Sequence, residues 1–83
     1  MPGLLVEVNH PTYGLERYKI RVVRRFNVPN DTLQPVLQRR VASEQLSCLV
    51  VGRGVSEREI MEYITEHFKR TGMWERVLLL KMV

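Results

Sequence analysis

The chain has 83 residues, a formal net charge of +4 and 45% hydrophobic residues, which suits one folded domain and leaves no room for a second core. Its composition excludes a disordered chain, and no apolar run approaches the roughly 18 residues of a membrane span. The first residues lack the basic segment and long apolar stretch of a signal peptide, so we expect residues 1–83 to form one cytoplasmic α+β domain.

Two strands are predicted at the start of the chain. Residues 4–9 contain enough Val and Leu for a short strand, and Pro11 and Gly14 mark a turn after it. Residues 15–28 then alternate between apolar and polar side chains over the longest such stretch in the sequence. The two segments together predict a β-hairpin.

The alternation in residues 15–28 also predicts which side chains are buried. From residue 17 onward the even positions, which include Tyr18 and Phe26, are apolar apart from Arg24, and the odd positions are basic apart from Val23 and Asn27. This pattern is typical of a strand that has one buried face and one face in water.

Residues 33–42 fit either a helix or a strand. Asp31 or Thr32 can cap a helix, and Pro35 lies within its first turn, where a backbone N–H has no intrahelical partner. We therefore expect a helix, with a strand that forms a hairpin through residues 42–45 as the alternative. The apolar residues at helical spacing are Leu33, Val36, Leu37 and Val41.

A short apolar strand is predicted over residues 45–51, and a helix follows it. Ser56 and Glu59 have the spacing of a capping box at the start of this helix, and Gly72 is placed to end it. The residues expected on its inner face are Ile60, Met61, Ile64, Phe68 and Thr71.

Residues 76–83 form the last predicted strand, which is apolar on both faces and is therefore expected at the centre of the sheet. The predicted order is ββαβαβ, a mixed four-stranded sheet with two helices on one face. The strand–helix–strand unit over residues 46–83 is expected to be a right-handed parallel crossover.

Several segments resemble ubiquitin-like β-grasp proteins. The stretch VPNDTLQPVLQRRV after the opening hairpin is similar to the family's second strand and first helix, with Pro29, Asp31 and Thr32 at the cap. EQLSCLVVGRGVSE resembles the third strand and its turn, REIMEYI the short later helix, and ERVLLLKMV the final strand. The resemblance implies a β-grasp-like fold and a binding role.

The chain departs from that family at its end, which is KMV and not a Gly-Gly tail, so conjugation and sulfur transfer through such a tail are not implied. The second helix is also longer than the family's. A ferredoxin-like split sheet is the alternative fold, because the helix followed by WERVLLLK is similar to the end of many ferredoxin-like domains.

The sequence offers little to a catalytic mechanism, and we expect no enzyme activity, no metal and no cofactor. The one aspartate, Asp31, is a predicted cap, which leaves a Ser/His/Asp triad without its orienting acid. His10 and His67 are expected at the surface, and Cys48, within an apolar run, is expected in the core.

The stretch VVGRGVSERE at residues 50–59 has the glycines and the helix start of an anion site. Ser56 and Glu59 already use the donors of that helix start, and Glu57 stands where a dinucleotide-binding loop needs its third glycine. Only a weak anion site at Arg53 and Gly54 remains.

The basic face of the second strand is the better candidate for a binding surface. Lys81 and two apolar residues of the last strand are expected to join it and make a small apolar patch rimmed by basic groups. The predicted surface comprises Arg17, Lys19, Arg21, Val23, Arg25, Val77, Leu79 and Lys81.

We therefore expect a small non-catalytic protein-interaction module of ubiquitin-like type, which binds a protein partner or itself through its sheet. The alternative is a nucleic-acid-binding protein, like small regulatory proteins of mobile elements or viruses, that uses the basic strand Arg17–Arg25. No membrane and no small-molecule substrate is expected.

Overall fold

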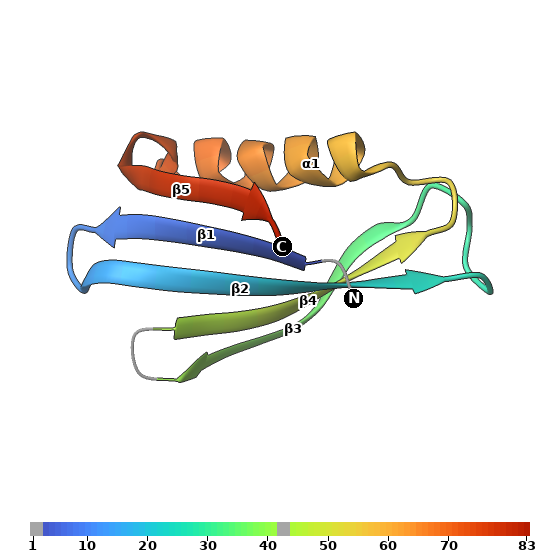
Figure 1. Ribbon diagram of the computed structural model, residues 1–83, viewed down its shortest axis with the longest axis horizontal. Coiled ribbons are helices and arrows are strands. Elements are labelled where there is room, and N and C mark those ends of the chain that lie inside the picture. Colours follow the sequence, from blue (N-terminus) through green and yellow to red (C-terminus); the bar gives the residue numbers. More distant parts are fainter. Residues whose placement is uncertain (1–2, 42–43) are drawn as a thin grey trace.

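One helix lies against one face of a five-stranded mixed sheet (Figure 1). The computed structural model describes residues 3–41 and 44–83, and for residues 37–41 and 44–46 it describes the backbone alone. The strands are β1 (Gly3–His10), β2 (Gly14–Arg25), β3 (Leu33–Val41), β4 (Glu44–Gly52) and β5 (Val77–Met82), and their order across the sheet is β3-β4-β2-β1-β5. The helix α1 (Glu57–Arg70) and the short 3₁₀ helix η1 (Trp74–Arg76) connect β4 to β5. The α+β class is as predicted, with five strands and one helix in place of four and two.

The predicted β1–β2 hairpin is confirmed. The two strands are antiparallel, with Val6 opposite Tyr18 and Leu4 opposite Ile20. The even positions of both strands face α1, and Leu4, Val6 and Val8 are almost completely buried. The prediction was wrong at Phe26, because β2 ends at Arg25 and leaves the Phe26 side chain 74% exposed.

The predicted helix over residues 33–42 was wrong, and the alternative was right: β3 is an edge strand that pairs antiparallel with β4. A β-bulge between Pro35 and Leu37 explains the error, because the extra residue brings two apolar positions next to each other and imitates a helical period. An edge strand also tolerates Pro35, which has no N–H to donate. Residues 42–43 of the predicted turn lie outside the described residues.

The two hairpins join through a parallel pairing of β2 with β4, in which Ile20 is opposite Ser47 and Val22 is opposite Leu49. Because β2 and β5 are both antiparallel to β1, β4 and β5 run in the same direction, as predicted for the crossover. They are not neighbours, since β2 and β1 lie between them. The predicted central position of the last strand was therefore wrong, and β5 is an edge strand.

The caps of α1 match the predicted helix ends. The Glu59 N–H donates to Ser56 Oγ at 3.2 Å, and the Ser56 hydroxyl donates to Glu59 Oε1. At the other end, Gly72 has a φ of 73°, and the Met73 N–H donates to the Phe68 carbonyl, which is a Schellman motif. Helix side chains Ile60, Ile64 and Phe68 are buried against the sheet. Among the described residues, no helix has the length and apolar character needed to cross a bilayer.

The corner between β4 and α1 packs tightly on the loop that follows β2. The Gly52 N–H donates to the Thr32 carbonyl at 2.9 Å, and the Gly54 N–H donates to the Asn30 carbonyl at 2.9 Å. A Cβ atom at Gly52 would overlap the backbone carbonyl oxygen of Pro29. The close approach of these two backbones therefore requires glycine at position 52.

Gly52→Ala is expected to lower the free energy of unfolding by about 3 kcal/mol or more, because backbone must move to admit the methyl group. Gly72→Ala is the matched control: its new Cβ would meet nothing within 4 Å, so it carries only the cost of a positive φ, about 1–2 kcal/mol. Urea denaturation followed by circular dichroism measures both. Equal losses for the two variants would contradict the close approach at Gly52.

Candidate functional site

Among the described residues, no helix lies over the face of the sheet opposite α1, and we call this face the open face. It carries the odd-numbered residues of β1 and β2, with Leu5 opposite Lys19 and Glu7 opposite Arg17. Neighbouring strands add Cys48, which pairs with Arg21, and Lys81, which pairs with Leu5. The sheet thus gathers side chains from four strands on one uncovered surface.

All but one of the residues of the predicted surface lie together on the open face. A β-bulge in the pairing of β5 with β1 sets Val77 opposite Val8, so that Val77 packs against the core beneath α1. The alternation of the sequence could not show this, because the bulge shifts Val77 out of phase with Leu79. The predicted residues that share the open face are Arg17, Lys19, Arg21, Val23, Arg25, Leu79 and Lys81.

Two small apolar groups lie among these basic residues. Val23 pairs with Val50 at one end of the open face, and Leu5 lies diagonally across from Leu79 at the other. All four side chains are half-buried although no element covers them. Leu5 and Val50 were missed in the sequence, because their place beside the basic strand depends on the order of strands in the sheet.

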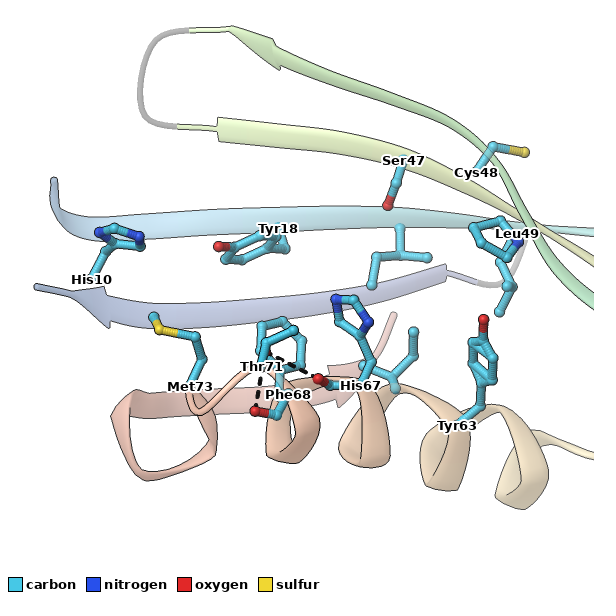
Figure 2. Close-up of a pocket in the computed structure, with 13 residues that line it drawn as sticks. His10, Tyr18, Ser47, Cys48, Leu49, Tyr63, His67, Phe68, Thr71 and Met73 are labelled. Atoms are coloured by element: carbon cyan, nitrogen blue, oxygen red, sulfur yellow. Dashed lines mark hydrogen bonds between the residues drawn. The ribbon is translucent and has the colours of Figure 1, made fainter. Parts of the chain in front are cut away.

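The basic character of the open face is uneven. Arg17 Nη2 lies 3.4 Å from Glu7 Oε2, which offsets its charge within the sheet. The exposed basic residues are Arg21, Arg25 and Lys81. Their positive charges are accessible to a partner. Cys48, expected in the core, is half-buried; it is among the residues that line the groove beside α1, but Figure 2 shows its sulfur directed away from α1, toward the open face.

A second feature is a groove between α1 and the part of the sheet that the helix leaves uncovered (Figure 2). We call it the α1 groove; it encloses a cavity of about 270 Å³. Its floor is formed by Ile20 and Leu49, and Tyr18 packs edge-to-face on Phe68 with ring centroids 5.3 Å apart. Its polar lining residues include Ser47, Tyr63, His67 and His10.

The histidines of the α1 groove have different surroundings. His10 Nδ1 accepts hydrogen bonds from the N–H groups of Thr12 and Tyr13, so it holds the turn after β1. His67 was predicted as a surface residue, yet it lies on the flank of α1 that lines the groove, one turn after Tyr63. The i, i+4 spacing of Tyr63 and His67 was the available signal for this shared flank.

The side chains with catalytic or metal-binding chemistry do not come together. Cys48 points to the open face, and His67 lies on the other side of the sheet (Figure 2). Throughout residues 3–41 and 44–83, excluding the side chains of 37–46, no three His, Cys, Asp or Glu residues are grouped to hold a metal ion. The described groove suits recognition of a largely apolar group.

At the weak anion site predicted at Arg53 and Gly54, one donor of each residue already has a partner within the protein. Arg53 Nε donates to Asn30 Oδ1 at 2.9 Å, and the Gly54 N–H donates to the Asn30 carbonyl. Beside them, Arg24 Nη1 donates to the carbonyls of Gly52 and Val55, each at 2.8 Å. Arg24, which with Glu16 is charged among the even positions of β2, thus stabilises the corner before α1.

Arg24→Met is expected to cost about 1–2 kcal/mol of unfolding free energy, because two carbonyl groups lose a charged donor. Arg25→Met is the matched control, since the exposed Arg25 side chain lies on the other face, and its cost should stay within about 0.5 kcal/mol. Denaturant titration of both variants checks the difference. A stability of Arg24→Met equal to that of Arg25→Met would show that the two hydrogen bonds do not hold the corner.

Comparison of the chain with models of protein families, with curated proteins and with solved structures found no match. The ubiquitin-like resemblance therefore stays a prediction. The segment that resembled the first helix of that family is strand β3, so the fold has no helix between its second and third strands.

Proposed function

We propose that the protein is a non-catalytic protein-interaction module that binds its partner through the open face. The observation that carries this proposal is the half-buried pair Val23 and Val50 beside exposed Arg21 and Arg25, on a sheet face with no helix over it. Uncovered apolar groups within a polar, charged rim are typical of protein-binding surfaces.

The charge of the open face indicates the kind of partner. Arg21 and Arg25 come from the central strand β2 and Lys81 from the edge strand β5, and Glu7 is paired with Arg17. A complementary surface would have carboxylates around a small apolar centre, which favours an acidic partner protein. The ubiquitin-like type stays part of this proposal, since those domains are recognised through the surface of their sheet.

Absence of catalysis is part of the proposal as well. The separation of Cys48 from His67 by the sheet argues against a thiol nucleophile activated by imidazole. The α1 groove has an apolar floor of Ile20 and Leu49, and polar groups are among the residues that line it. Such a groove supports binding better than acid–base chemistry.

Site-specific photo-crosslinking in the native host tests the open face. A benzoylphenylalanine in place of the exposed Lys19 should cross-link one discrete protein, whereas the same residue at Glu62, on the outer surface of α1, should not. The double variant Arg21→Glu/Lys81→Glu, combined with the label at Lys19, should abolish that product. Cross-linking that is equal from both positions, or unchanged by the charge reversal, would contradict the proposal.

A nucleic acid is the second candidate partner, and the position of Phe26 favours it. Phe26 is 74% exposed directly after Arg25, so an aromatic ring for base stacking lies beside the basic strand. Arg21 and Arg25 would then contact phosphates.

Fluorescence anisotropy with a labelled 20-mer, single-stranded and duplex, tests this candidate at about 50 and about 200 mM salt. If phosphates are contacted, affinity falls steeply with salt, and Phe26→Ala weakens single-strand binding by about tenfold. Tyr13→Ala, at an aromatic residue in the β1–β2 turn that is 64% exposed, is the control and should change little. No binding of either nucleic acid at the lower salt concentration would exclude the candidate.

A further inference from the structure

The position of β5 in the sheet conflicts with its sequence. VLLLKM is apolar on both faces, which is typical of a strand with neighbours on both sides. In the part of the chain that the structure describes, however, β5 lies at an edge of the sheet and pairs with β1 alone. The opposite edge strand, β3, contains Pro35 and a bulge, which are devices that discourage pairing with another chain. In the part of β5 that pairs regularly with β1, Lys81 is the one residue of this kind, because a charged side chain also discourages pairing.

The register of β5 shows which backbone groups face outward. Gly3 and Val83 exchange two hydrogen bonds, at 3.1 and 2.8 Å. Bonded and non-bonded pairs alternate along an antiparallel ladder, so Lys81 and Leu79 are the next residues that bond to β1. Leu80 and Met82 therefore direct their N–H and C=O groups away from β1. In the described sheet no strand lies beyond β5 to receive them.

The side chains of the same residues are incompletely covered by α1. The β1 residues Val6 and Val8 are 0% exposed beneath the helix, whereas Leu80 and Met82, on the same face of β5, are only half-buried. Leu78, at the bulge, is 65% exposed. A neighbouring strand at this edge would therefore cover apolar side chains as well as backbone groups.

We propose that two copies of the chain pair through their β5 strands, antiparallel and in register about Leu80, so that their two five-stranded sheets become one continuous sheet. The register follows from the outward groups: only Leu80 or Met82 can exchange hydrogen bonds across the edge, and centring on Leu80 pairs the greatest length of β5. A contact of this kind is isologous, as in most homodimers.

The charges agree with this register. On the open face, Leu79 of each copy stands opposite Lys81 of the other, so that no two like charges are directly opposed. Glu7 of the second copy lies one strand beyond its Leu79, about 10 Å from Lys81, so the Lys81 side chain extends over Leu79 toward an acidic group. In the dimer the two open faces form one continuous surface. The pairing of the β5 strands does not depend on which partner that surface binds.

Two substitutions at Leu79 test the register by sedimentation equilibrium. Leu79→Glu and Leu79→Lys remove the same apolar side chain, but the first sets a carboxylate opposite Lys81 of the second copy and the second sets an ammonium there. We expect Leu79→Glu to dimerise about tenfold more tightly than Leu79→Lys, with a difference that shrinks in high salt. If both variants lose dimerisation alike, the copies associate through the open face itself, and the β5 pairing is wrong.

A second pair of variants tests the backbone contact. Leu80→Pro removes an N–H that β1 does not use, and we expect it to raise the dimer dissociation constant about tenfold or more over Leu80→Ala, which loses the side chain but keeps the N–H. If Leu80→Pro does not fold, the Leu79 pair decides. A wild-type chain that stays monomeric up to millimolar concentration would overturn the dimer without affecting the cross-linking test of the open face.

Discussion

A single helix has to cover a sheet that is wider than the helix, and the other features of the molecule depend on this mismatch. A helix is about 10 Å across, whereas five strands spaced about 4.8 Å apart span roughly 20 Å. Helix α1 therefore buries the side chains of β1 that face it, Leu4, Val6 and Val8, and leaves those of β5 on one side half-buried. On its other side lies the α1 groove, and the opposite face of the sheet receives no helix at all.

Each of these uncovered regions has its own chemistry. The open face combines basic groups with Val23 and Val50, the α1 groove combines an apolar floor with Tyr63 and His67, and the β5 edge exposes backbone groups beside Leu80. The open face and the β5 edge share Leu79 and Lys81, whereas the α1 groove lies on the other side of the sheet. The open face and the β5 edge support the two proposals made for this chain.

Much of the fold follows from local rules that the sequence displays. Alternation located the buried face of the β1–β2 hairpin, and Ser56 and Gly72 marked both ends of α1. The errors at residues 33–42 and at Val77 have one common cause, since each lies at a β-bulge that shifts the period by one residue. Strand order is set by contacts between distant residues, which is why the edge position of β5 and the partners Leu5 and Val50 could not be predicted.

The parallel pairing of β2 with β4 also bears on how the chain folds. Each antiparallel hairpin can form by closing a short loop, but the parallel pairing joins residues such as Arg21 and Cys48, which are 27 positions apart. Isolated hairpins are marginally stable, so neither half of the sheet is expected to persist until this pairing forms. The rate-limiting step of folding is then the docking of one hairpin on the other, and substitutions along the β2–β4 boundary should slow folding more than substitutions in either turn.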